Sequence, residues 1–197
     1  MTEFILIRHG ETDWNVQGRL QGRTDIPLNS IGIEQANLVA GELRASEWDI
    51  IVSSPLQRAY QTAAVITRAL GMDESVIITN ADLRERSYGA VEGLTVAERD
   101  ARYPDHVWPD AESTPELNER AARAIEEFAE IYAGKRVLVV SHGGWIRAVL
   151  RVVSNFDKHV IDRVIPNVSR SYVSHDGERW HIGEIAVPPA VGAVADR

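Results

Sequence analysis

The sequence predicts an α/β domain with a mainly parallel central sheet. Short apolar runs of strand length alternate with segments of helical periodicity from the first residues onward. Two strand-like runs, residues 168–173 and 180–187, flank an Asp-Gly turn and predict a terminal hairpin. With 197 residues, 44% of them hydrophobic, the chain can bury a sizeable core. We expect one catalytic domain over residues 1–187 and a flexible tail over residues 188–197.

The first half of the chain contains three strand candidates. Residues 4–7 form the first, a short apolar run. The residues at helical spacing after it are Ile33, Ala36, Ala40 and Leu43. The second strand, residues 50–52, precedes a helix for which Ser54 is the expected N-cap and Pro55 the first residue. Residues 76–78 form the third.

The second half continues the alternation. The spacing of Thr95 and Glu98 is that of a capping box, which predicts a short helix. Residues 103–115 are irregular, and residues 137–140 form the fourth strand. Apolar residues at helical spacing predict one helix before this strand and one after it in the sequence. They are Leu117, Ala121, Ala124, Ile125 and Phe128 in the first helix, and Ile146, Val149, Leu150 and Val153 in the second.

Charge and composition exclude several classes of protein. A formal net charge of -8 disfavours a general nucleic-acid or membrane-surface role. Because the chain has no cysteine, disulfide frameworks, thiolate metal sites and cysteine nucleophiles are excluded. The apolar run at residues 4–7 is too short for a signal-peptide core or a membrane span. We therefore expect a cytoplasmic protein.

Reactive side chains follow three of the predicted strands, where an open α/β sheet binds its ligands. His9 lies between Arg8 and Gly10 after the first strand, Arg58 lies in the helix after the second, and His142 follows the fourth. Arginines beside histidines do not suit a metal, so no metal and no cofactor is expected. They suit an anion, because guanidinium groups match phosphate oxygens.

Two further features complete a site for phosphoryl chemistry. Helix N-termini after Gly10, Pro55 and Gly144 are expected to add backbone N–H donors to the same anion. A neutral histidine can attack phosphorus, and Glu85, on the loop after the third strand, can protonate a departing alkoxide and then activate water. The residues thus predict a metal-independent phosphomonoesterase.

The same residues resemble the histidine phosphatase superfamily, also called the phosphoglycerate mutase-like family. The matching segments are residues 8–15, Gln21-Gly22, Asp25, Pro27-Leu28, Gly32, Gln35-Ala36, residues 53–59 and 61–63, Leu83-Arg84-Glu85, Gly89, residues 92–95 and residues 141–144. The resemblance implies a three-layer α/β/α sandwich. It also implies His9 as the nucleophile that becomes phosphohistidine and Glu85 as the proton donor. The implied phosphate pocket consists of Arg8, Asn15, Arg58 and His142, with Gln21, Gly22 and Gly143 lining it.

Three departures favour the phosphatase branch over the mutases. The interval from Glu85 to His142 is short, the segment from Ala186 to Arg197 has no lysine, and Ser87 stands where mutases usually have histidine. A phosphoglycerate mutase is the alternative enzyme. A catalytically silent domain that binds a phosphorylated ligand or a partner protein is the alternative of another class.

The expected substrate is a small phosphorylated metabolite, and its identity stays open, as does the oligomeric state. Positive potential near the mouth would favour a second anionic group, and the arginines suggested for it are Arg19, Arg23, Arg84 and Arg86. Residues 103–115 are the candidate substrate lid, from which Trp108 would overhang the pocket. A plain connecting loop is an equally weighted alternative for this segment. Glu112 and Ser113 partly match a Gly-Glu-Ser pattern of phosphatase members, with Ala111 in place of glycine.

Overall fold

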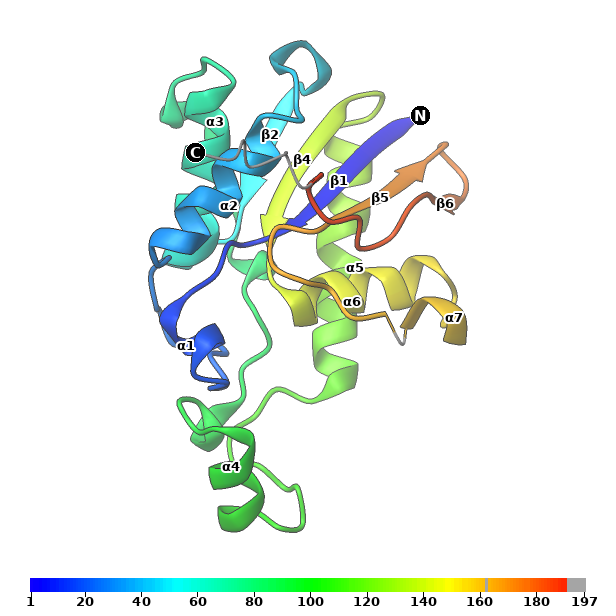
Figure 1. The fold of residues 1–197 in the computed structure, drawn as a ribbon. Helices are drawn as coiled ribbons and strands as arrows, with labels where there is room; N and C mark the ends of the chain where they lie inside the picture. Colours follow the sequence, from blue (N-terminus) through cyan, green and yellow to red (C-terminus); the bar gives the residue numbers. More distant parts are fainter. Residues whose placement is uncertain (162, 191–197) are drawn as a thin grey trace.

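A computed structural model describes residues 1–161 and 163–190, which form a mixed six-stranded sheet between layers of helices (Figure 1). The strands are β1 (Thr2–Arg8), β2 (Ile50–Ser53), β3 (Ile77–Thr79), β4 (Arg136–Ser141), β5 (Arg170–His175) and β6 (Trp180–Ile182). Their order across the sheet is β3-β2-β4-β1-β5-β6. The pairs from β3 to β1 are parallel, whereas β5 and β6 pair antiparallel. The predicted parallel sheet with a terminal hairpin is confirmed.

Helices cover both faces of the sheet. One face packs against α2 (Ser30–Ala40) and α3 (Gln57–Ala69), and the other against α5 (Thr114–Ile131) and α6 (Gly143–Val153) (Figure 1). Successive side chains of a strand point to opposite faces. In β1, Phe4 and Leu6 therefore join the core beside α5 and α6, while Ile5 and Ile7 join the core beside α2 and α3. This is the three-layer α/β/α sandwich that the resemblance implied.

Three short helices lie outside these layers: α1 (Asp13–Val16), α4 (Val96–Arg102) and α7 (Lys158–Ile161). The capping box at Thr95 and Glu98 predicted α4, whereas no sequence pattern predicted the other two. Among the described residues, no helix has the length and apolarity needed to cross a membrane.

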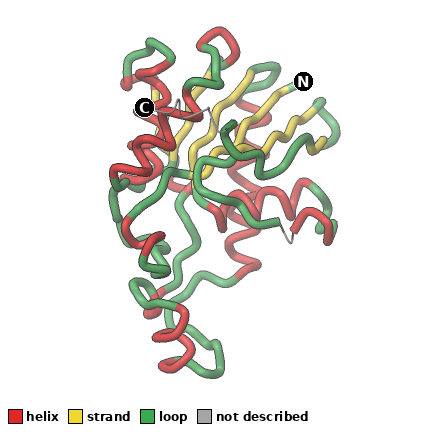
Figure 2. The backbone as a smooth tube through the Cα atoms, in the orientation of Figure 1, coloured by secondary structure: helices red, strands yellow, loops and turns green. Residues whose placement is uncertain are grey.

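The segment between β3 and α5, residues 80–113, leaves the sheet and forms a separate lobe around α4, which we call the excursion (Figure 2). Arg120 of α5 fastens its base. The guanidinium of Arg120 donates to the carbonyl oxygens of Asp82 (2.6 Å) and Arg84 (2.8 Å) and pairs with the carboxylate of Glu112 at 2.8 Å. The Arg120 and Glu112 side chains are only 9% and 10% exposed. One arginine thus fixes where this lobe leaves and rejoins the core.

The start of α3 differs from the prediction. The helix begins at Gln57, and Ser54 is not its N-cap. The Ser54 hydroxyl lies 2.8 Å from His142 Nε2, and Asp25 Oδ1 accepts the first-turn N–H of Gln57 at 2.7 Å. The cap comes from a residue 32 positions away, so local sequence could not identify it.

The buried face of α2 also differs from the prediction. Ile33 is 45% exposed, and Leu43 lies beyond the end of the helix. Gly32 is buried against the loop after β1, where a Cβ would lie 2.1 Å from the Glu11 carbonyl oxygen. The close approach of this helix to the loop after β1 requires glycine at that position.

Smaller boundary differences concern the second half of the chain. Pro115 lies in the first turn of α5 and is not part of the irregular segment. The first hairpin strand has the predicted length but starts two residues later, at Arg170. The second is shorter than predicted, with Val187 contributing only an isolated bridge to Arg170. Of the predicted tail, residues 191–197 lie outside the described residues.

Candidate active site

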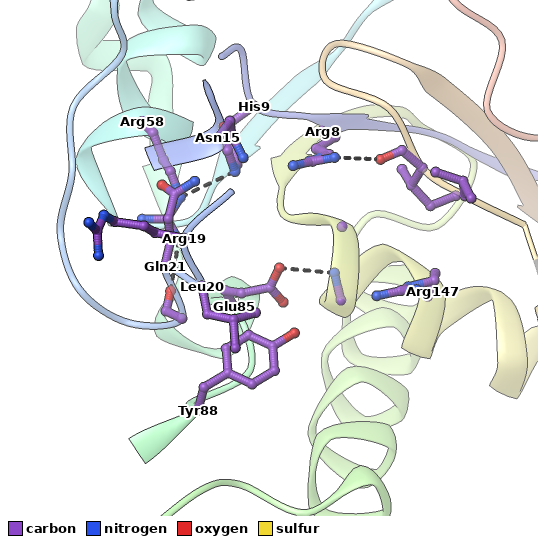
Figure 3. A pocket seen from close by; sticks show the side chains of 15 residues that line it. Arg8, His9, Asn15, Arg19, Leu20, Gln21, Arg58, Glu85, Tyr88 and Arg147 are labelled. Atoms are coloured by element: carbon purple, nitrogen blue, oxygen red, sulfur yellow. Dashed lines mark hydrogen bonds between the residues drawn. The ribbon is translucent and has the colours of Figure 1, made fainter. Parts of the chain in front are cut away.

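A pocket of about 210 Å³ opens at the carboxyl end of β1. Parallel pairing sets Arg8 of β1 opposite Ser141 of β4, so the residues that follow these strands meet at one edge of the sheet. Its polar side chains come from β1, the loop through α1, α3, the excursion and α6 (Figure 3). They are Arg8, His9, Asn15, Arg19, Gln21, Arg58, Glu85, Tyr88 and Arg147.

His9 lies at the bottom of this pocket and is 3% exposed. Its Nδ1 is 2.6 Å from the Gly10 carbonyl oxygen, a contact in which Nδ1–H must donate. Nε2 accepts from Arg58 Nε at 3.2 Å. Burial, followed by the charges of Arg58 and Arg8, holds the pKa of His9 well below its usual value. The imidazole is therefore neutral, with its unprotonated nitrogen on the side of Arg58.

Arg58 comes from the first turn of α3 and is 1% exposed. It donates to the carbonyl oxygens of Gly22 (2.7 Å) and Thr24 (2.9 Å) as well as to His9. Burial, only partly offset by Glu85 and Asp25, lowers the pKa of Arg58 to about 10. The guanidinium stays charged at neutral pH and ties the nucleophile candidate to the opposite loop.

Arg8 supplies a second guanidinium, on a half-buried side chain. Its Nη1 donates to the carbonyl oxygen of Ile165 at 2.7 Å, the contact dashed in Figure 3. Its Nε is buried and has no hydrogen-bond partner in the described part of the chain. Burial is the largest cause that lowers the pKa of Arg8. An anion in the pocket would supply the acceptor that Nε lacks.

His142 lies behind the pocket wall and does not line it. It is 0% exposed, and its ring centroid is 5.2 Å from that of His9. The Ser54 hydroxyl accepts from the Leu56 N–H at 3.3 Å and can donate to His142 Nε2 at 2.8 Å. In that tautomer Nδ1 carries the proton, and this buried Nδ1 has no partner among the described residues. Burial, then Arg58, holds the pKa of His142 well below its usual value.

Glu85 does not form the surface salt bridges that its neighbours Arg84 and Arg86 suggest. Its two carboxylate oxygens accept from the backbone N–H groups of Gly144 (3.0 Å) and Trp145 (3.1 Å), in the first turn of α6. A helix N-terminus favours a carboxylate. A Cβ at Gly144 would lie 2.3 Å from Glu85 Oε1, so the approach requires glycine. The carboxylate is thereby aimed into the pocket (Figure 3).

The prediction that backbone N–H groups at helix N-termini bind the anion was wrong for three of these groups, because each already donates to a protein oxygen. The Gly144 N–H is taken by Glu85, and the Gly10 N–H donates to Thr62 Oγ1 at 3.0 Å. The Gln57 N–H donates to Asp25. These donors are satisfied by protein oxygens, so side chains must supply most of the contacts to a bound anion.

The loop opposite His9 brings Asn15, Gln21 and Gly22 to the pocket, as predicted. Gly22 has φ +56°, and a Cβ there would overlap the carboxylate of Glu92. Glu92 accepts from the backbone N–H groups of Arg23 (3.0 Å), Thr24 (2.9 Å) and Tyr88 (3.0 Å). This carboxylate fastens the loop to the excursion.

Two predictions about the pocket mouth were wrong in part. Of the four arginines suggested there, only Arg19 lines the pocket. Arg23 pairs with Glu112 at 3.4 Å, Arg84 Nε donates to Ala81, and Arg86 donates to Glu112 and lies over the Tyr88 ring.

No described residue of 103–115 lines the pocket. Trp108 packs against the Tyr88 ring, with centroids 6.0 Å apart, and the guanidiniums of Arg86 and Arg99 lie over its own ring. Tyr88 thus separates this segment from the pocket. Segment 103–115 supports the wall and does not overhang it as a lid.

Tyr88 and Arg147 also line the pocket, although they were not predicted from the sequence, as do the apolar residues Leu20, Val164 and Ile165. Arg147 follows Gly143 and Gly144 at helical spacing, which places it on the same face of α6. Tyr88 lies three residues beyond Glu85. Only the position of Arg147 was accessible from helical periodicity. Tyr88, Val164 and Ile165 come from irregular segments without a sequence pattern.

The sequence of this chain is similar to those of known proteins. The family model described as histidine phosphatase superfamily (branch 1) matches residues 4–187. The chain is 40% identical over 182 residues to the uncharacterized phosphatase PhoE of Bacillus subtilis (strain 168), covering 92% of this chain and 93% of that one. It is 34% identical over 195 residues to the probable phosphoglycerate mutase GpmB of Yersinia pestis (strain Pestoides F), covering 91% and 88%.

A solved structure with the same fold is that of a phosphoserine phosphatase mutant from Entamoeba histolytica in complex with phosphoserine. It superimposes with a TM-score of 0.82 at 29% sequence identity. The match covers 94% of this chain and 97% of the other.

Proposed function

Because the chain belongs to the histidine phosphatase superfamily (branch 1), we propose that it is a metal-independent phosphomonoesterase that acts through a phosphohistidine on small phosphorylated metabolites. The observation that carries the proposal is the state of His9. It is a buried, neutral imidazole whose Nδ1 is fixed by Gly10, and the guanidiniums of Arg8 and Arg58 line the pocket into which it faces.

In the first step, His9 Nε2 forms a bond to phosphorus while the ester P–O bond breaks. Arg8 and Arg58 neutralise the phosphoryl oxygens, and His142 Nδ1–H adds a donor from behind the wall. Glu85, in its protonated form, gives its proton to the departing alkoxide. The products of this half-reaction are an alcohol, a phosphohistidine and a Glu85 carboxylate.

In the second step, the Glu85 carboxylate takes a proton from a water molecule, whose oxygen attacks phosphorus. The P–N bond breaks, inorganic phosphate leaves, and His9 and Glu85 return to their starting states. One carboxyl group thus serves as acid and then as base.

A mutase is the second candidate, favoured by the 34% identity to a probable phosphoglycerate mutase. In that reaction the phosphohistidine returns its phosphoryl group to another hydroxyl, which requires exclusion of water. The departures at Ser87, in the Glu85 to His142 interval and in the lysine-free segment after Ala186 weigh for the phosphatase. The identity of the PhoE relative, at 40%, weighs the same way.

The test is a chelator-treated assay with two readouts. Phosphate release is followed from p-nitrophenyl phosphate, phosphoserine and 3-phosphoglycerate, and interconversion of 3- and 2-phosphoglycerate is followed in parallel. We expect release without interconversion and without added metal. Interconversion faster than release would support the mutase. Activity that EDTA removes and a divalent cation restores would contradict metal independence.

A cytoplasmic location and the absence of nucleic-acid and membrane partners stay predictions from composition. Fractionation of cells that express the chain would test the first. Retention on a DNA or vesicle surface at moderate salt would contradict the second.

A further inference from the structure

The turn that precedes β5 contacts the backbone of Arg8 and His9 at several points. The Val168 N–H donates to the carbonyl oxygens of Arg8 (3.0 Å) and His9 (3.4 Å), and the Arg8 N–H donates to the Ser169 carbonyl oxygen at 3.2 Å. The carbonyl oxygen of Ile165 accepts from the Arg8 guanidinium. The proposed nucleophile and the arginine before it are thus held by a segment that is distant in the sequence.

This turn has a strained backbone. Val168 has φ 52° and is 2% exposed. A β-branched residue rarely adopts this left-handed conformation, because its Cβ lies too close to a neighbouring carbonyl oxygen. The conformation is held by the packing of Val168 in the core beside α2 and α3, and by the Ser169 hydroxyl, which donates to the Pro166 carbonyl oxygen at 2.7 Å. Strain of this kind clusters where the backbone presents a functional group. The side chain next to Val168 in this turn is that of Asn167.

Asn167 uses one amide group for two contacts. Its Nδ2 donates to the carbonyl oxygen of His9 at 2.9 Å and to Oδ1 of Asn15 at 3.4 Å. A backbone carbonyl only accepts, so the atom that faces His9 must be the amide nitrogen. Asn167 is half-buried and does not line the pocket. It therefore contacts the residues that attack and bind the phosphoryl group, and not the phosphoryl group itself.

The contact with His9 fixes the peptide bond that follows the nucleophile. This peptide is planar and is held at both of its polar atoms. Asn167 donates to its oxygen, and its N–H, which belongs to Gly10, donates to Thr62 Oγ1 at 3.0 Å. Gly10 also supplies the carbonyl oxygen that accepts from His9 Nδ1. A rotation of this peptide would therefore move the acceptor that sets the direction of the His9 ring and of its Nε2.

The contact with Asn15 helps to orient a second amide. Asn15 Oδ1 accepts from the backbone N–H of Thr12 at 3.1 Å and from the Thr12 hydroxyl at 3.0 Å, and Asn167 adds a third donor. Because protein donors occupy this oxygen, the amide nitrogen is the end of Asn15 that can donate to a phosphoryl oxygen in the pocket. Asn167 thus links the attacking residue to a residue that binds its target.

We propose that Asn167 is a positioning residue, which holds the His9 imidazole and the Asn15 amide in register around the phosphorus atom. This inference rests on the proposed phosphatase function and adds a residue to it. No proton or phosphoryl group passes to or from Asn167 in either step. Its contribution is the alignment of the attack, which matters more in the transition state than in the ground state.

The test compares Asn167→Ala and Asn167→Asp with the wild type. Asn167→Ala removes the donors without adding charge, whereas Asn167→Asp keeps the shape of the side chain and loses only its N–H groups. Asn37 is an exposed asparagine of α2 that donates to the Ile33 carbonyl oxygen, so Asn37→Asp is the matched control outside the pocket. The values measured are kcat and KM for p-nitrophenyl phosphate and the Kd values of inorganic phosphate and orthovanadate. Orthovanadate bonded to the imidazole resembles the transition state, and phosphate resembles the ground state.

We expect Asn167→Ala to lower kcat by about 10-fold to 100-fold and to leave KM within about threefold, because misalignment costs rate more than binding. Vanadate affinity should fall in parallel with kcat, while phosphate affinity should stay. Asn167→Asp should lose at least as much kcat, and Asn37→Asp should match the wild type. Unchanged kcat in Asn167→Ala, tolerance of Asn167→Asp, or equal losses of vanadate and phosphate affinity in Asn167→Ala would overturn the positioning role.

The fold of each variant is checked by circular dichroism at the assay temperature. If Asn167→Ala does not fold, Asn167→Asp, with its native shape, decides the question. Its added charge weakens both anions, so the ratio of vanadate to phosphate affinity isolates alignment from charge. A lowered ratio supports the proposal, and an unchanged ratio refutes it.

The link to Asn15 is tested by a double-mutant cycle. Asn167→Ala should cost less in kcat/KM when Asn15 is already alanine, with a coupling above about threefold. Additive losses would overturn the link between the two amides.

Failure of the proposed function can be told apart from failure of this inference. If the wild type hydrolyses no ester, the phosphatase proposal fails. The ratio of vanadate to phosphate affinity needs no turnover and still tests Asn167, with the same two outcomes. If the wild type binds neither anion, both proposals fail.

Discussion

The floor of the pocket and the excursion are built in opposite ways. On the floor, His9 follows β1 and is 3% exposed, and His142, directly behind it, follows the adjacent parallel strand β4 and is 0% exposed. In the excursion, Glu85 and Tyr88 lie on a segment without regular strands, whose base is fixed by Arg120 and whose pocket edge is fixed by Glu92. Strand pairing positions the first set, and side chains that bind backbone groups position the second.

This difference separates what each region can do. The floor presents groups whose protonation is set by burial and by guanidinium charges, as nucleophilic chemistry requires. The excursion presents a carboxylate and a hydroxyl whose placement depends on a few long-range contacts. Substrate preference can therefore change in the excursion without disturbing the floor.

The largest effect should come from removing the nucleophile on the floor. His9→Ala is expected to lower kcat/KM by on the order of 10⁵-fold, because the covalent route is lost. Phosphate release under chelator measures it. The exposed histidine variant His106→Ala is the control and should retain wild-type activity. Residual turnover of His9→Ala within tenfold of the wild type would remove His9 from the mechanism.

The second-largest effect is expected from removing the proton donor Glu85 of the excursion. Glu85→Gln is expected to slow esters with poor alkoxide leaving groups by about 10²-fold to 10⁴-fold in their first step. The first step of p-nitrophenyl phosphate should fall much less, because nitrophenolate leaves without a proton. Pre-steady-state release of each alcohol measures the difference. Equal losses for both kinds of ester would point to another proton donor.

The attachment of the excursion can be broken at Arg120. Arg120→Met should lower the free energy of unfolding by about 3 kcal/mol, because it leaves the buried Glu112 carboxylate without its closest partner. It should also lower activity through displacement of Glu85. Denaturant unfolding measures the first effect. Arg123→Met, which removes an arginine 62% exposed on the same helix, should change stability by less than about 1 kcal/mol.

The smallest expected effect is the pH dependence of the free energy of unfolding, which comes from the buried histidines His9 and His142. The folded pKa values of His9 and His142 lie below the unfolded value of 6.5, so the unfolded state binds protons first as the pH falls. Stability is full above pH 6.5 and declines below it, by up to about 1.4 kcal/mol per pH unit for each histidine. Unfolding titrations between pH 7 and 5.5 measure this slope. His9→Ala should reduce it, and an unchanged slope would contradict the assigned burial effect.

The same comparison explains which features the sequence could predict. The floor was predictable, because apolar runs locate the strands and the site residues follow them directly. His9 and Arg58 were found in this way, as was Glu85 on the loop after the third strand, which the resemblance to the family then supported. Arg147 was missed although helical spacing placed it beside Gly143 and Gly144.

The remaining features depend on contacts between distant residues. Asp25 accepts the first N–H of α3, and the anchors of the excursion are Arg120 and Glu92. No local pattern pairs such side chains with the backbone groups that they bind. For the same reason, the sequence left open whether residues 103–115 form a lid or a plain connection, whereas in the structure Trp108 packs behind Tyr88.

The central claim is that the phosphoryl group passes through His9. The most direct measurement is rapid mixing with p-nitrophenyl phosphate, quenching in alkali to preserve phosphohistidine, and mass spectrometry of the intact protein and its peptides. Glu85→Gln should accumulate the adduct, because its second step lacks the base. We predict one phosphoryl group on the peptide that contains His9 and none in His9→Ala. Phosphate release without any adduct, or an adduct that persists in His9→Ala, would contradict the account.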